Sequence, residues 1–110
     1  MSDAMLHGIL NMPTDLWTDD HLNQVQRHNT YVSASKRIYE LTDALEKTKL
    51  VKVEHHPDIV NRLRGFYSLG PFGTRNMTPY VMPICIEAAS RIEELEATIS
   101  KLEKDKLFPN

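Results

Sequence analysis

Cysteine and histidine are the side chains in this sequence most suited to catalysis or metal binding. Cys85 is the single cysteine among 110 residues, which excludes a disulfide within the chain. A nucleophilic thiol needs a neighbouring base, and no histidine lies near Cys85 in the sequence. We therefore expect Cys85 to be an inert side chain that packs as a small hydrophobic group.

The histidines do not have the spacing of metal ligands. His55 and His56 are adjacent, so their side chains diverge, and no His-x3-His pair places two ligands on one helical face. His21 and His28 are seven residues apart. That is about 10 Å along a helix, too far for both to bind one zinc ion. We expect helix-capping or solvated histidines, and neither a metal nor a cofactor.

Carboxylates and glycines are the other candidates for catalysis. Four glutamates lie on one helical stretch, where such residues are far more often the solvated flanks of a seam that set partner choice. They are Glu93, Glu94, Glu96 and Glu103. Gly70 and Gly73 match no phosphate-binding loop. The sequence therefore predicts a protein that is not an enzyme.

Recognition residues are easier to find than catalytic ones. A loop at about 68–80 is rich in turn-forming residues and carries aromatic side chains, which dominate the energetics of many protein interfaces. The candidates for partner binding are Phe72, Tyr67, Arg75, Tyr80, Arg62 and Arg64. The aromatic residues could instead close the end of a helical bundle, and the sequence leaves both interpretations open.

A basic surface for nucleic acid is an alternative. Basic residues gather around the middle of the chain, at Lys47, Lys49, Lys52, Arg62 and Arg64. The formal net charge of the chain is −2, however, and a negative balance gives no general attraction for nucleic acid. A protein partner is therefore favoured.

The elements that must position these residues are helices. Periodicity and helix-terminal residues predict an all-α fold with helices at about 18–49, 57–67 and 82–106, packed antiparallel. Residues 1–17 are expected to form an irregular arm, and residues 18–110 a single helical domain. Thr18 is the predicted start of the long first helix, and Leu22, Val25 and Val32 are predicted to share an apolar stripe.

The C-terminal helix carries a coiled-coil-like seam, with apolar side chains at alternating spacings of three and four residues. The seam consists of Ala88, Ile92, Leu95, Ile99 and Leu102, and the first helix offers a similar row at Ile38, Leu41 and Leu45. Such side chains must be covered by a neighbouring helix. Because a three-helix monomer of this size has little core, we expect a homo-oligomer.

The two long helices also share a sequence pattern. Residues 32–41 align with residues 86–95 at a constant offset of 54, with five identities. The two helices could pack on each other, or each could pack on a copy from a second chain. Whether this shared pattern is a true duplication stays open, because two copies are a weak repeat signal.

Part of the sequence resembles small uncharacterised accessory proteins of tailed phages and prophages. Residues 58–64 read Asp-Ile-Val-Asn-Arg-Leu-Arg, and residues 87–96 read Glu-Ala-Ala-Ser-Arg-Ile-Glu-Glu-Leu-Glu. The family pattern is Asp-(Ile/Leu)-Val-x-Arg-Leu-Arg, a variable loop, then Glu-Ala-Ala-x-x-Ile-Glu-x-Leu-Glu. The resemblance covers about residues 57–104, and it implies a helical protein without a cofactor that acts in the bacterial host cytoplasm.

The leading hypothesis is a non-enzymatic phage accessory protein involved in host takeover. It would bind a host or phage protein through helix faces and the 68–80 loop, and would inhibit or redirect that protein. The alternatives are a nucleic-acid-associated protein and a structural or assembly component of a phage particle. A cytoplasmic location is expected, because no apolar run approaches the roughly 20 residues of a membrane span and the N-terminus does not resemble a signal peptide.

Overall fold

Helices make up nearly all of the secondary structure. The computed structural model of the chain describes residues 2–48, 58–70, 72–73 and 76–107. Its elements are α1 (Asp3–Leu10), the short 3₁₀ helix η1 (Thr14–Leu16), α2 (His21–Thr48), α3 (Asp58–Tyr67), the 3₁₀ helix η2 (Thr78–Tyr80) and α4 (Val81–Leu107). These residues contain no strand, so the predicted all-α class is confirmed.

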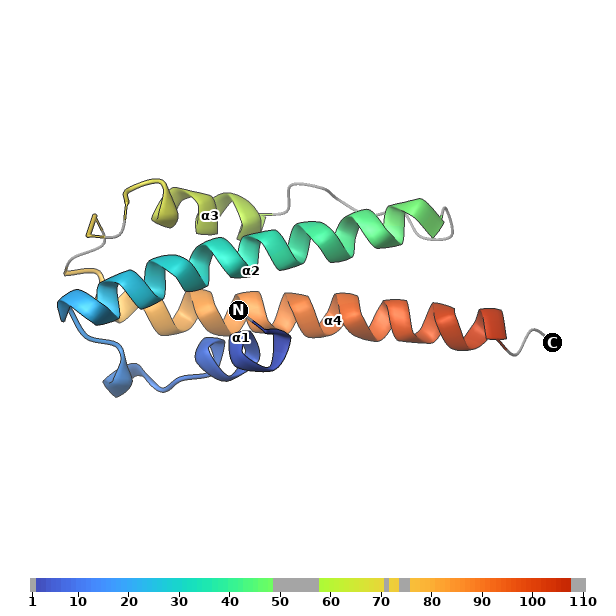
Figure 1. Ribbon diagram of the computed structural model, residues 1–110, viewed down its shortest axis with the longest axis horizontal. Helices are drawn as coiled ribbons and strands as arrows, with labels where there is room; N and C mark the ends of the chain where they lie inside the picture. The colour runs from blue at the N-terminus through green and yellow to red at the C-terminus, as the bar shows by residue number, and fades with distance from the viewer. Residues whose placement is uncertain (1, 49–57, 71, 74–75, 108–110) are drawn as a thin grey trace.

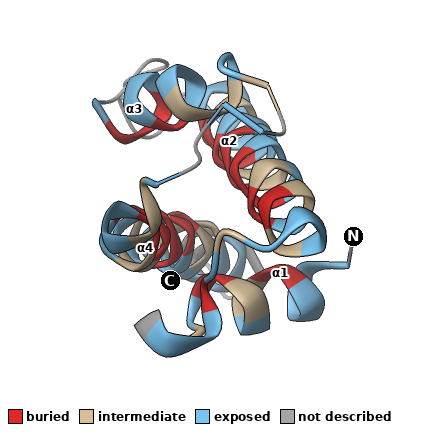
Figure 2. Cartoon of the chain, turned by 90° about the vertical axis from the view of Figure 1, so that its left-hand side faces the viewer, coloured by how far each residue is buried: buried red, intermediate tan, exposed pale blue. Residues whose placement is uncertain are grey.

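Two long helices, α2 and α4, lie side by side and run in the same direction (Figure 1). The shorter helices α3 and α1 run the opposite way, α3 against α2 and α1 against both long helices. Viewed end-on, α1 and α3 cover opposite sides of the α2–α4 pair, and the buried residues face inward (Figure 2). The prediction of antiparallel packing is therefore right for α2 with α3 and wrong for α2 with α4, because α3 returns the chain to the end where α2 begins.

The first 17 residues are not an irregular arm, because they contain α1. The Ser2 hydroxyl accepts a hydrogen bond from the Met5 amide at 3.2 Å and so caps the start of this helix. Leu6 and Leu10, one turn apart, are buried against the core. Gly8 weighs against a helix by propensity, and the burial of these two leucines outweighs that preference.

Helix α2 is continuous from His21 to Thr48, but its first half buries a different face from the one predicted. Leu22 is 82% exposed and Val32 is 39% exposed, so they do not form a core stripe. Polar or amphipathic side chains take their place in the core, among them Gln24, Arg27, Thr30 and Tyr31. The helix also begins at His21 rather than at Thr18, because the backbone before it is held by side-chain hydrogen bonds described below.

The predicted seam is the core between α2 and α4. Six of its eight residues are buried, namely Ala88, Ile92, Leu95, Ile38, Leu41 and Leu45. Ile99 and Leu102 are partly buried and pack against the same cluster. All this burial occurs within one chain, so the seam does not require the second copy that we expected to cover it.

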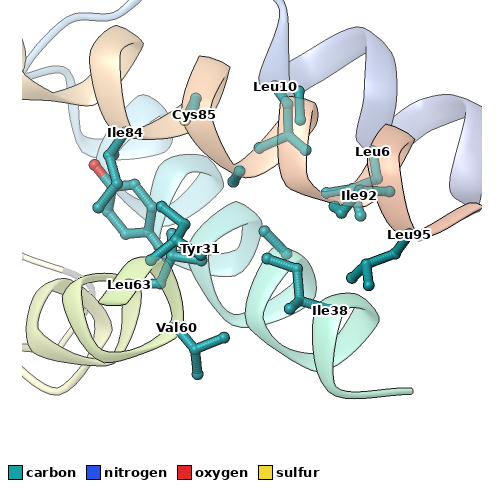
Figure 3. Packing of buried hydrophobic residues seen from close by; sticks show 14 of the residues in the cluster. Leu6, Leu10, Tyr31, Ile38, Val60, Leu63, Ile84, Cys85, Ile92 and Leu95 are labelled. Atoms are coloured by element: carbon teal, nitrogen blue, oxygen red, sulfur yellow. The ribbon is translucent and has the colours of Figure 1, made fainter. Parts of the chain in front are cut away.

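The shared sequence pattern places its two halves on neighbouring helices. Because α2 and α4 are parallel, residues 54 positions apart lie at similar heights along the pair. Tyr31 on α2 lies beside Ile84 and Cys85 on α4, and further along Ile38 points toward α4 at the level of Ile92 and Leu95 (Figure 3). The first of the two interpretations of the shared pattern therefore holds: the two helices pack on each other.

Replacing Ile92 with alanine tests this packing. Ile92 is 1% exposed, so truncation should leave a cavity and lower the free energy of unfolding by about 2–5 kcal/mol. Chemical denaturation followed by circular dichroism measures the change. Ile99→Ala in the same seam is the control and should cost less, because Ile99 is only partly buried. An equal or larger loss for Ile99→Ala would contradict the burial described here.

Candidate functional site

The loop between α3 and α4 folds back on the end of α3. The backbone amides of Leu69 and Gly70 donate to the carbonyls of Phe66 and Tyr67, which ends α3. Gly70 has φ +85°, a conformation that glycine adopts without steric cost. A Cβ atom on Gly73 would lie 2.0 Å from the Leu69 carbonyl oxygen, so the turn needs glycine there as well. Phe72 is therefore presented from a turn whose shape depends on its flanking glycines.

The far end of this loop is held to the start of α2 by the side chain of Asp19. One carboxylate oxygen accepts a hydrogen bond from the Asn76 amide at 3.1 Å, and the other accepts one from the Thr78 hydroxyl at 3.0 Å. Asn76 has a positive φ of 69°, which asparagine tolerates better than most residues. Residues more than fifty positions apart are thus joined through one carboxylate.

Arg27 supports this junction from inside the molecule. Its guanidinium has no exposed surface and donates to the Asp19 carboxylate and the Thr18 carbonyl, both at 3.0 Å. It also donates to the Thr78 hydroxyl at 3.3 Å. A buried cation is costly unless it is paired and hydrogen-bonded, and these partners meet that requirement. We call Asp19, Arg27, Asn76 and Thr78 the Arg27 network.

The same contacts lower the pKa of the Asp19 carboxyl. Desolvation raises its pKa, but the hydrogen bonds from Arg27, the Asn76 amide and Thr78, together with the charge of Arg27, outweigh that effect. The net result is a pKa below the ordinary value of 3.8. The charged form of Asp19 is therefore the form that holds the loop.

Several exposed apolar side chains belong to the elements at the end of the molecule that this network organises. There α2 and α4 begin and α3 ends (Figure 1). Leu22 is 82% exposed, and Leu69, Phe72 and Tyr80 are between 47% and 62% exposed. The Phe72 ring also lies against His21, with ring centroids 4.3 Å apart. We call Leu22, Leu69, Phe72 and Tyr80 the aromatic end. The predicted residues Phe72 and Tyr80 thus lie on the surface and do not plug the bundle.

The other predicted recognition residues lie elsewhere. Arg62 is already paired, with Glu87 on α4 and with Asp58 on its own helix. Arg64 and Tyr67 instead line a groove between α2 and α3, on the flank of the molecule. The structure therefore separates the predicted site into the aromatic end, the groove and a structural ion pair. Arg75 lies outside the described residues, as do Lys49 and Lys52 of the basic group and the adjacent pair His55 and His56.

The candidates for chemistry occupy structural positions. Cys85 is fully buried, and burial raises the pKa of its thiol to about 12, which keeps it protonated and unreactive. Among the predicted carboxylates, Glu96 lies 3.5 Å from Arg37 on α2, and Glu94 lies 3.2 Å from Arg91. Within the part of the chain that the structure describes, no three His, Cys, Asp or Glu side chains are grouped to hold a metal ion. No helix there is long and apolar enough to cross a bilayer.

Sequence reasoning missed the residues that build the site. Arg27 and Thr78 were not singled out, and Leu22 was placed in the core. One signal was present: an arginine on the inward-facing stripe of a continuous helix needs an acidic partner within reach. The sequence did not indicate that this partner lies eight residues earlier and reaches a loop near residue 78.

Comparison with known proteins gives no relative for this chain. No family model matches it, and neither the curated proteins nor the solved structures contain a significant match.

Substituting asparagine for Asp19 tests the charge in the Arg27 network. The variant keeps the side-chain size but loses the negative charge, so it should melt at a lower temperature than the wild type at neutral pH. The pKa of Asp19 is lower in the folded state than in the unfolded state. The stability that its charge contributes is therefore complete above pH 3.8 and is lost as the pH falls through the folded-state pKa. The difference in melting temperature should therefore shrink on acidification, as measured by thermal denaturation at a series of pH values.

The matched control is Asp15→Asn, which removes a carboxylate from an exposed position in η1. It should leave the melting temperature nearly unchanged across the series. A difference for Asp19→Asn that is absent at neutral pH, or that grows on acidification, would contradict the ion pair.

Proposed function

We propose that this chain is a non-enzymatic interaction protein that binds another protein through the aromatic end. The observation that carries the proposal is the exposure of four large apolar side chains at the end that the Arg27 network organises. Scattered exposed apolar residues are ordinary on a protein surface. Apolar residues at the end where a buried arginine and a partly exposed aspartate hold a loop are better explained by a binding surface.

The way the loop is held also suits binding. A partner that docks on a loose loop must bear the entropy cost of ordering it, which lowers affinity. Here Asn76 and Thr78 are bonded to Asp19, and the turn before them is shaped by Gly70 and Gly73. Phe72 and Tyr80 flank these anchors, so a partner would meet side chains that are already positioned.

The setting we propose is that of a phage or prophage accessory protein in the bacterial cytoplasm. This rests on the resemblance of residues 58–64 and 87–96 to that family. The partner would be a host or phage protein, and the chain would inhibit or redirect it by covering part of its surface. Because the seam is buried within one chain, a single copy of the chain would bind the partner.

Nucleic acid is the weaker alternative. Arg62 is engaged by Glu87 and Asp58, which removes one of the basic residues on which that alternative relied. Of the others, Lys47 is paired with Asp43 at 3.1 Å. A net charge of −2 adds no general attraction for phosphates.

The double variant Phe72→Ala and Tyr80→Ala tests the aromatic end. Both side chains are about half exposed, so we expect the variant to lose no more than about 1 kcal/mol of stability. It should, however, lose the proteins that the wild-type chain captures from bacterial lysate, as quantified by mass spectrometry.

Met5→Ala is the matched control, because Met5 is 57% exposed on α1 and its truncation also removes exposed apolar surface. This control should capture the same proteins as the wild type. Capture that is unchanged in the double variant, or lost equally in the Met5 control, would refute the assignment. A marked fall in melting temperature would instead identify Phe72 and Tyr80 as core residues.

A further inference from the structure

The groove between α2 and α3 is a second surface feature that is suited to binding a ligand. It has a volume of about 370 Å³ and is lined by residues of these two antiparallel helices. The buried side chain of Val60 contributes to its floor, and Val32 and Tyr39 contribute walls that are 39% and 49% exposed. Tyr67 is a second aromatic wall. An apolar side chain of a ligand could therefore be covered on several sides here.

The charges around the groove are unbalanced. Lys36 and Arg64 both line it, and among the described residues neither has a carboxylate partner. Glu40 also lines the groove, but it lies 3.8 Å from Arg37, which offsets its charge. The groove thus combines apolar lining with two positive charges that no carboxylate of the described residues pairs.

We propose that the α2–α3 groove binds an acidic peptide segment of a partner protein, with an aromatic or leucine side chain on Val32 and Val60. Glutamate or aspartate residues beside that anchor would pair with Lys36 and Arg64. This proposal rests on the proposed function, because it names a second contact for the same kind of partner. It does not depend on the aromatic end, which lies at the tip of the molecule rather than on its flank.

Charge complementarity and shape favour a peptide over a nucleic acid. A nucleic-acid strand carries a regularly repeated charge, and its binding normally needs a track of basic residues with several phosphate contacts. Among the described residues that line the groove, the cations are Lys36 on α2 and Arg64 on α3. A short apolar segment with flanking carboxylates matches that arrangement, as in other grooves that bind one amphipathic segment.

The test is a titration of the ¹⁵N-labelled full chain followed by amide chemical shifts. The probe is the capped peptide Glu-Glu-Phe-Glu-Glu, and the comparison ligands are Lys-Lys-Phe-Lys-Lys and a single-stranded oligothymidylate. We expect the acidic peptide to shift the amides of Ser35, Lys36, Val60 and Arg64, and the two comparison ligands to leave them unchanged. Added salt should weaken the binding, because exposed charges are screened.

The variant Lys36→Glu with Arg64→Glu should raise the Kd of the acidic peptide about tenfold or more, since two favourable surface pairs are lost. The control is Lys101→Glu with Lys104→Glu, which makes the same change of charge at exposed positions far along α4. That control should raise the Kd of the acidic peptide by less than half as much. Equal effects of the two variants, no shifts at the groove amides, or groove shifts caused equally by oligothymidylate would overturn the proposal.

The two proposals fail separately. The peptide titration should be the same for the wild type and for Phe72→Ala with Tyr80→Ala, because those residues do not line the groove. A negative titration would therefore remove the groove and leave the aromatic end to be decided by lysate capture.

Discussion

A guanidinium group with no exposed surface organises one end of this protein. Arg27 bonds the backbone before α2, the Asp19 carboxylate and the hydroxyl of Thr78, and Asp19 in turn receives the amide of Asn76. The start of α2 and the loop before α4 are therefore fixed by the same set of charges. Without a carboxylate to balance it, a buried arginine in this position would oppose folding, so the charge of Asp19 and the place of the loop depend on each other.

The core changes character along the molecule. Near the Arg27 network, α2 buries polar and amphipathic side chains, and further along it buries Ala34, Ile38, Leu41 and Leu45 against the apolar seam of α4. The seam forms the apolar core between α2 and α4, and the parallel arrangement of these helices brings their two starts to the same end. This explains why the loop that joins α3 to α4 can reach Asp19. The apolar seam and the polar network are thus two parts of one arrangement.

Much of the fold could be predicted from the sequence, because the helices follow from local periodicity. The seam residues Ile38, Leu41, Ile92 and Leu95 were expected to be covered by a helix, and they are. The direction of the covering helix was not predictable in this way, since an a/d seam fits parallel and antiparallel neighbours equally well. The helix at residues 3–10 was missed because Gly8 lowers its propensity, whereas burial of Leu6 and Leu10 decides the outcome.

The candidate site was predicted only in part, for a physical reason. Exposure of Phe72 and Tyr80 depends on where their loop packs, and that is set by contacts over more than fifty residues of sequence. Arg62 and Arg64 are two positions apart on one helix, yet they point to different surroundings, one paired with Glu87 and the other at the groove. Sequence spacing identified both as basic residues of α3. It could not tell which charge was already neutralised by a helix more than twenty positions away.

The most direct test of this account is the hydrogen-exchange rate of the Asn76 amide. Asn76 is exposed and lies outside the helices, so its amide would exchange rapidly unless it is bonded to Asp19 as described. We predict slow exchange at neutral pH, comparable with that of amides at the helix ends. Exchange at the rate of an unstructured peptide would show that the Arg27 network does not hold the loop.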